Sequence, residues 1–184
     1  MSRAHSPVAD GALVVKPMGG CARQSADKIL ALDLATETGW AFGQRGHCTL
    51  FGTWNLLPKG EPRPNRFRNL IVNLDRVAHS FGGIPDLIVY EDVKFTAGSP
   101  RVWCGLLAFL QVWCCDKTTL EPFAINTIKK FATGNGRADK QMMLKSARHK
   151  WGDTVPDHNS ADALWLLELA RGDDYEQRVQ AVPG

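Results

Sequence analysis

The sequence predicts an α/β domain in which a mixed, five-stranded sheet is flanked by helices. One observation is the order of the expected elements, in which a hairpin of strands is followed by alternating helices and strands. Another is the near-continuous apolar run at 29–35, which is typical of a strand buried on both faces. A chain of 184 residues is also long enough for one domain with a substantial core.

Three strands and a helix are expected in the first half of the chain. The first strand is "KILALDLA", and "TGWAFGQ" and "HCTLFGTWNL" follow it, joined by a tight hairpin at Arg45 and Gly46. Apolar residues recur at helical spacing from Phe67 to Phe81, which predicts an amphipathic helix that "GGIP" ends. The fourth strand is then "DLIVY".

The second half of the chain is expected to be mainly helical. A helix from about Pro100 to Cys115 is apolar nearly all round, and it is too short to span a bilayer comfortably. "PFAI" is the expected fifth strand and "TIKKFA" a short helix. A basic helix is expected over about 138–151, and the last helix, "SADALWLLELAR", carries Asp162 in its first turn.

The folded domain is expected to span 27–172. Residues 1–26 mix Gly, Pro, Ser and Ala without periodicity and are predicted to form a flexible arm, and 173–184 a flexible tail. The five cysteines form no C-x-x-C pair, and a secretory signal is not evident. This pattern favours a reduced, cytoplasmic protein.

Positive charge is unevenly distributed, although the net charge is only +3. The stretch 128–150 holds seven cations and one acid. A smaller cluster combines four cations with Glu61; these cations are Lys59, Arg63, Arg66 and Arg68. Such clusters suit a polyanion such as nucleic acid, and a solvated helix face is the alternative interpretation.

Three acids stand where a carboxylate is costly or conspicuous. Asp33 lies inside the first strand, Glu91 ends the fourth, and Asp162 lies in an otherwise apolar helix. If the first and fourth strands pair, Asp33 and Glu91 approach each other, and a helix laid across that edge adds Asp162. Three carboxylates so close would repel one another and remain protonated unless a cation joined them, and hard oxygen ligands select Mg²⁺ or Mn²⁺. Two such ions can hydrolyse a phosphodiester.

Each acid also has a purely structural alternative. Asp33 would accept hydrogen bonds from the following loop, Glu91 would pair with a lysine, and Asp162 would cap a helix. The groups concerned are Thr36, Thr38 and Gly39 for Asp33, Lys94 for Glu91, and the helix N-terminus at Ser160 for Asp162.

Four segments together resemble the RuvC-type Holliday junction resolvases of the small, phage-like sort, which have a ribonuclease H-like fold. "ALDLATETGWA" resembles the first catalytic strand and "LIVYEDV" the second acidic strand. "INTIKKFATGNGRADKQMM" resembles the Lys–Gly–Lys segment that lies on DNA, and "DHNSADALWLLELA" the last catalytic helix. With the strand "FGTW", the resemblance covers roughly 28–170.

The resemblance implies a metal-dependent endonuclease that resolves Holliday junctions and other branched DNA by paired phosphodiester hydrolysis. It implies two Mg²⁺ ions in each active site, with Mn²⁺ as a substitute. The catalytic, metal-binding acids that it implies are Asp33, Glu91 and Asp162. The implied DNA contacts are Lys129 and Lys140, with Lys130 and Arg137 in the same basic segment. Phe95 would stack on opened bases, or it would lie in the core.

The chain departs from the family at the fourth metal ligand. Family members usually carry an acid or histidine three residues before the last aspartate, where this chain has Asn159. An amide oxygen can bind a hard metal but brings no charge, and His158 and Asp157 are the neighbouring candidates.

The resemblance also implies a two-fold homodimer, which matches the approximate symmetry of a four-way junction. The helix at 100–115 would form the interface, and a core helix of a monomer is the alternative. The interface residues expected are Leu106, Leu107, Phe109, Leu110 and Trp113.

Other functions fit parts of the same pattern. A nuclease of this fold that acts on RNA or RNA–DNA hybrids would use the same acids. A catalytically weakened junction-binding protein would fit the neutral Asn159. An actin-like ATPase is suggested by "DLATETG", but it needs two related domains and a second phosphate loop, which we do not find in the 184 residues.

Overall fold

The computed structural model describes residues 13–15, 28–44, 49–93, 100–115 and 117–172. Helices and strands alternate over 65–133, and two further helices follow, as the sequence predicts. The elements are β1 (Leu13–Val15), β2 (Lys28–Asp33), β3 (Glu37–Gln44), β4 (Thr49–Asn55), α1 (Asn65–Ser80), β5 (Leu87–Asp92), α2 (Pro100–Cys114), β6 (Thr119–Ala124), α3 (Ile125–Thr133), α4 (Lys140–Trp151) and α5 (His158–Arg171).

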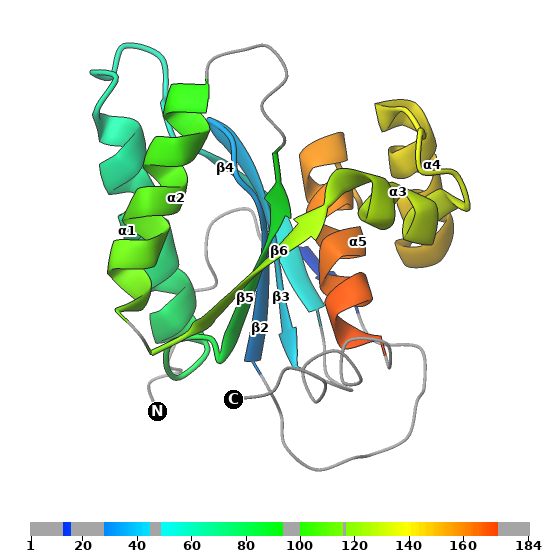
Figure 1. Cartoon of the computed structure of the whole chain (residues 1–184), viewed down its shortest axis with the longest axis horizontal. Helices are drawn as coiled ribbons and strands as arrows, with labels where there is room; N and C mark the ends of the chain where they lie inside the picture. Colours follow the sequence, from blue (N-terminus) through cyan, green and yellow to red (C-terminus); the bar gives the residue numbers. More distant parts are fainter. Residues whose placement is uncertain (1–12, 16–27, 45–48, 94–99, 116, 173–184) are drawn as a thin grey trace, which may run out of the picture.

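The strands form one mixed sheet in the order β1-β4-β3-β2-β5-β6 (Figure 1). β2, β3 and β4 are antiparallel neighbours, whereas β5 and β6 run parallel to β2. The predicted mixed α/β fold is therefore confirmed. The structure adds β1, a short strand within 1–26 that pairs with β4. The hairpin expected at Arg45 and Gly46 lies outside the described residues.

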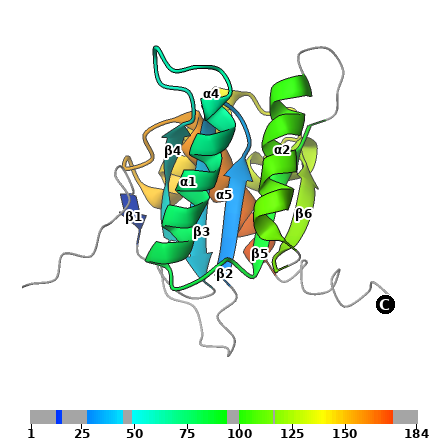
Figure 2. The same cartoon turned by 90° about the vertical axis from the view of Figure 1, so that its left-hand side faces the viewer.

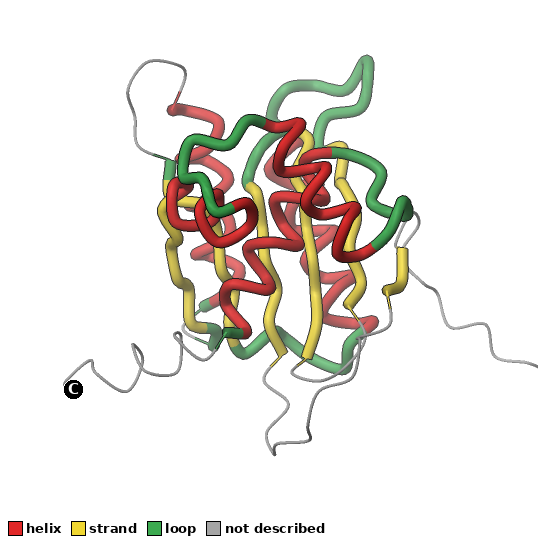
Figure 3. The backbone as a smooth tube through the Cα atoms, turned by 90° about the vertical axis from the view of Figure 1, so that its right-hand side faces the viewer, coloured by secondary structure: helices red, strands yellow, loops and turns green. Residues whose placement is uncertain are grey.

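Helices cover both faces of the sheet. α1 and α2 lie on one face, as Figure 2 shows, and α5 lies on the other with α3 and α4 packed against it, on the side that Figure 3 views. Side chains that alternate along a strand therefore enter two different cores. Ile29 and Ala31 of β2 pack in the core under α5, and Leu30 and Leu32 pack in the core under α1 and α2.

The parallel strands bring several segments to one edge of the sheet. β2 and β5 both end at this edge, where the chain also enters α1 and α5 (Figures 1 and 2). We call it the carboxyl edge. In open α/β sheets, ligands bind outside the carboxyl ends of the strands. The fold thus places the ends of β2 and β5 where a site is expected.

The structure corrects part of the interface expected on α2. Leu106 and Leu110 are fully buried in the core under α1 and α2, so these two assignments were wrong. A helix that is apolar all round does not reveal from sequence which side faces the core. Phe109 and Val112 are 43% and 72% exposed, respectively. Among the described residues, no helix is both long and apolar enough to cross a bilayer.

Truncation of core and surface positions on α2 should separate its two sides. We expect Leu110→Ala to lower the free energy of unfolding by about 2–5 kcal/mol, because it leaves a cavity in a closed core. Arg101→Ala, at an exposed position in the first turn of α2, is the control and should change it by about 0.5 kcal/mol or less. Urea unfolding measures both values, and similar losses for the two variants would contradict the placement of α2.

Candidate active site

Two of the three acids meet at the carboxyl edge. The parallel pairing of β2 and β5 aligns Leu32 with Tyr90, so the next residues, Asp33 and Glu91, lie side by side. Alternation directs both carboxylates to the face that α5 covers, the same face as Ala31 and its neighbours. The pairing expected between the first and fourth strands is therefore confirmed.

The N-terminal turn of α5 is fixed by hydrogen bonds to β4. Asp157 caps the helix and accepts a hydrogen bond from the backbone N–H of Ser160 at 2.8 Å. Thr53 Oγ1 of β4 donates to Asp157 Oδ1 at 2.9 Å and lies 3.0 Å from Ser160 Oγ. Since Asp157 is the cap, the interpretation of Asp162 as the capping residue was wrong.

A glycine allows α5 to lie directly on β3. Gly39 is paired with Asp33 across β2 and β3, and a Cβ atom at Gly39 would lie 2.0 Å from the carbonyl oxygen of Asn159. No side chain fits in that space. The close contact sets how near Asp162, three residues further along α5, comes to Asp33. A glycine inside a strand signals such close approach, but the sequence did not reveal its partner.

Burial raises the pKa of all three acids, and repulsion from neighbouring carboxylates adds to the rise at Glu91 and Asp162. Burial, with the charges of Asp33 and Asp162 added to it, raises the pKa of Glu91 to about 8. Burial and the charge of Asp33 raise the pKa of Asp162 to about 7. Burial raises the pKa of Asp33 to about 6, against the opposing charges of Lys140 and His158. The three carboxylates thus share one electrostatic environment.

The expected local partners of Asp33 are engaged elsewhere. Thr38 Oγ1 donates to the carbonyl of Ala35 at 2.6 Å, and Thr36 Oγ1 accepts a hydrogen bond from Arg66 at 3.3 Å. Lys94, the expected partner of Glu91, lies outside the described residues. Within the described part of the chain, the carboxylates of Asp33, Glu91 and Asp162 form no side-chain hydrogen bond or salt bridge.

Two lysines stand beside the acids. Lys129 of α3 and Lys140, the first residue of α4, both lower the pKa of Glu91 and Asp162 through their charge. The structure therefore brings this lysine pair to the three acids. Lys130 and Arg137 are exposed on the same pair of helices and their connecting loop. Phe95 lies outside the described residues.

The donor set matches hard divalent cations in its chemistry. It offers carboxylate oxygens without hydrogen-bond partners, together with the half-buried Asn159 and His158 nearby. In the described residues, no three Asp, Glu, His or Cys side chains converge closely enough to form a metal centre as they stand. Repulsion keeps like charges apart, and a bound cation removes that repulsion. The residues therefore fit Mg²⁺ or Mn²⁺ by ligand type.

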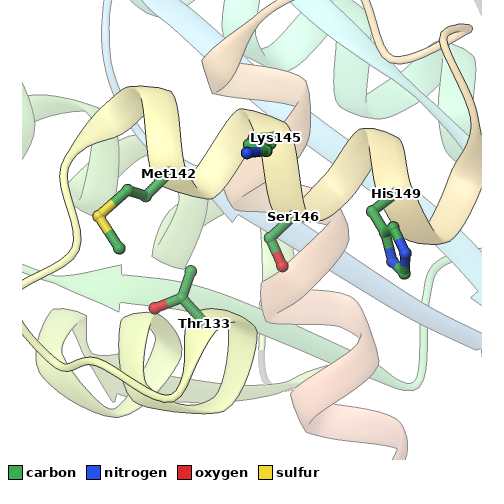
Figure 4. A pocket seen from close by; sticks show the side chains of 5 residues that line it. All are labelled: Thr133, Met142, Lys145, Ser146 and His149. Atoms are coloured by element: carbon green, nitrogen blue, oxygen red, sulfur yellow. The ribbon is translucent and has the colours of Figure 1, made fainter.

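A separate pocket of about 350 Å³ lies between α3 and α4 (Figure 4). It contains none of the three acids. Lining residues are Thr133, Met142, Lys145, Ser146 and His149. The hydroxyls of Thr133 and Ser146 already donate to backbone carbonyls of α3. The pocket is therefore not part of the carboxylate site.

The stability of the metal-free protein should depend on pH through these acids. Their folded pKa values of about 6, 8 and 7 lie above the ordinary 3.8, 4.5 and 3.8. The folded state thus binds protons more tightly than the unfolded state. The contribution of the three acids to the free energy of unfolding is therefore complete below about pH 4, and it is lost as pH rises through 6 to 8. We expect the melting temperature of Glu91→Gln, minus that of the wild type, to increase from pH 4 to pH 8 in EDTA. If the melting temperatures of the two proteins changed with pH in parallel, the raised pKa of Glu91 would be contradicted.

The contact at Gly39 can be tested without touching an acid. Gly39→Ala should lower the free energy of unfolding by roughly 1–3 kcal/mol, because the added methyl group overpacks the contact with α5. Gly172→Ala is the control, since a Cβ atom there meets its nearest neighbour at an ordinary 3.4 Å. Urea unfolding checks both, and a neutral Gly39→Ala would show that α5 does not depend on this contact.

Comparison with known proteins relates this geometry to a known fold. No protein-family model and no curated protein sequence matches the chain. Among solved structures, Thermus thermophilus RuvC matches with a TM-score of 0.61 at 18% identity, over 83% of this chain and 96% of that one. T. thermophilus RuvC in complex with Holliday junction substrate matches with the same score and identity, over 78% and 94%. The chain therefore has a RuvC-like fold, of the ribonuclease H-like α/β class.

Proposed function

We propose that the protein is a metal-dependent endonuclease of the cytoplasm that resolves Holliday junctions and other branched DNA by paired phosphodiester hydrolysis. The observation that carries this proposal is the group of Asp33, Glu91 and Asp162 at the carboxyl edge, with Lys129 and Lys140 beside it. The RuvC-like fold supports it, since one of the matching structures is a complex with Holliday junction substrate.

The three acids would hold the divalent cations, two Mg²⁺ ions per site with Mn²⁺ as a substitute. When bound, the ions would activate a water molecule and stabilise the leaving oxygen. Asp33 and Glu91 stand on neighbouring strands, which fixes the spacing of their carboxylates. Asn159 is our candidate for a neutral fourth ligand, with His158 as the alternative, because Asp157 is already engaged as the helix cap.

The lysines would position the DNA strand. Lys129 and Lys140 come from different helices and act on the same acids, so a phosphate beside the acids would meet cations from both. Phosphate contacts fix the register of the nucleic acid without reading its sequence. Lys130 and Arg137 are exposed and would extend this contact along the strand.

Removing a metal-binding charge should separate cleavage from binding. We expect Asp33→Asn, Glu91→Gln and Asp162→Asn each to abolish cleavage of a mobile four-way junction while changing its dissociation constant little, because affinity comes from phosphate contacts. The control is Asp153→Asn, an exposed acid in the turn before α5. Near-wild-type cleavage by any of the three variants would contradict the assignment of that residue as a metal ligand.

A substrate panel decides between this function and its rivals. A four-way junction, a flap, a duplex and an RNA–DNA hybrid are incubated side by side, with and without Mg²⁺. We expect Mg²⁺-dependent paired cuts in the junction. Preferential cleavage of the hybrid would assign the protein to the RNA-directed nucleases of this fold. Tight junction binding without cleavage would fit a weakened enzyme, which the neutral Asn159 keeps as the second candidate.

Paired cuts in two strands need two active sites, and we propose that they come from a two-fold dimer. The outward side of α2 is the proposed interface, because it exposes Phe109 and Val112 beside the small residues Cys104 and Ala108. Phe109 also stacks on Phe67 of α1, which extends the apolar surface across both helices.

A charge at the outer face of α2 should break this dimer without unfolding the chain. Val112→Glu is expected to sediment as a folded monomer that nicks single strands, since an unpaired charge in an interface is strongly unfavourable. Ser80→Glu at the exposed end of α1 is the control. A wild-type protein that stays monomeric at micromolar concentration and still makes paired cuts would contradict the dimer.

A further inference from the structure

We propose that the segment 58–68, which leads into α1, is a second DNA-contacting surface, and that it holds a duplex arm of the branched substrate. We call it the α1 entry surface; its cations are Lys59, Arg63, Arg66 and Arg68. The proposal rests on the function proposed above, because it adds a contact to the same substrate. Figure 1 shows this segment on the opposite side of the sheet from α3 and α4, the helices that carry Lys129 and Lys140.

Acidic side chains of the described residues do not neutralise the charge of this surface. Lys59, Arg63 and Arg68 are exposed, and none of them forms a salt bridge with a described residue. The nearby carboxylate of Glu61 accepts hydrogen bonds from the side-chain amides of Asn65 and Asn69, at 3.2 Å and 3.0 Å. Glu61 is therefore held by neutral groups, and the positive charge is left for an external anion.

Hydrogen bonds attach this surface to the carboxyl edge next to the acids. Arg66 donates to Thr36 Oγ1 at 3.3 Å, and the backbone N–H of Leu56 donates to the carbonyl of Thr36 at 2.8 Å. Asn69 of α1 donates to the carbonyl of Leu56 at 3.1 Å. Since Thr36 follows Asp33 by three residues, the α1 entry surface borders the candidate active site.

The acids therefore lie between two cationic surfaces. Figures 1 and 2 show the segment before α1 at the end of the sheet where β2 terminates, on the side of α1 and α2. α3 and α4, with Lys129 and Lys140, lie across the sheet on the side of α5. A strand whose phosphate reaches the acids would have positive charge on both sides, and a branched substrate presents a duplex arm to each.

The backbone holds the cations in a defined arrangement. Arg66 Nε donates to the carbonyl of Arg63 at 3.1 Å. Backbone hydrogen bonds close the turns from Glu61 to Pro58 at 3.1 Å and from Asn65 to Pro62 at 2.9 Å. Prolines restrict the backbone further, so less conformational freedom is lost on binding. The exposed cations of this surface bind phosphates irrespective of base sequence.

The test is equilibrium binding of a synthetic four-way junction and a linear duplex over a series of KCl concentrations, without divalent cations so that no cleavage occurs. Arg63→Ala and Arg68→Ala should each weaken binding and reduce the log–log salt slope by about 0.9. Arg66 is left intact because it also holds Thr36. Arg76→Ala is the matched control, since Arg76 is exposed on α1 about 12 Å beyond Arg68 and should leave the slope unchanged.

The outcomes separate this proposal from the function on which it rests. Lys129→Ala serves as the comparison from the other side of the site. If the wild type binds the junction and Lys129→Ala reduces the slope, but Arg63→Ala and Arg68→Ala do not, the α1 entry surface is overturned and the proposed function stands. Weaker binding of the junction by Arg63→Ala and Arg68→Ala, with binding of the linear duplex unchanged, would contradict the assignment to a duplex arm. A wild-type protein that binds no branched DNA at all would instead contradict the proposed function.

Discussion

The N-terminal turn of α5 packs against the backbone of β3 at Gly39, and the position of Asp162 depends on this contact. A Cβ atom at Gly39 has no room beside the carbonyl of Asn159. Thr53 and Asp157 hold the same turn from β4. Neither Gly39 nor Thr53 is one of the proposed ligands. Both nevertheless determine whether a helix residue can join Asp33 and Glu91 at the end of the sheet.

The acids at this edge are unfavourable in the metal-free protein. Burial raises the pKa values of Asp33, Glu91 and Asp162, and repulsion adds to the rise at Glu91 and Asp162. No hydrogen bond from a described side chain offsets that cost. The fold tolerates them because two apolar cores, one on each face of the sheet, supply its stability. Strongly perturbed carboxylates in such a place are typical of functional sites. The lysines and the α1 entry surface would complement them by drawing in a polyanion.

Much of this arrangement could be predicted from local sequence patterns. The apolar run around Asp33 indicated a central strand, and parallel pairing with the strand of Glu91 put both acids on one face. Contacts between distant backbones left no such pattern. The fit of Gly39 against Asn159 and the capping of α5 by Asp157 depend on how β3 and β4 meet a helix more than 100 residues later. β1 is too short for periodicity to reveal it.

The helix α2 shows a different limit of sequence reasoning. Its apolar residues surround the helix, so the pattern did not distinguish the buried Leu106 and Leu110 from the exposed Val112. Only packing against the sheet and α1 fixes the rotation of this helix. The interface proposed here therefore keeps Phe109 from the residues that the sequence favoured, adds Val112, and excludes Leu106 and Leu110.

Binding of Mn²⁺ tests the central claim most directly, because it asks whether the three acids close around a cation. Calorimetric titration of the DNA-free protein, with electron paramagnetic resonance of the bound ion, compares the wild type with Glu91→Gln and with the surface control Asp153→Asn. The proposed site predicts saturable binding by the wild type and the control, and its loss in Glu91→Gln. Equal binding by all three proteins, or none by the wild type, would contradict it.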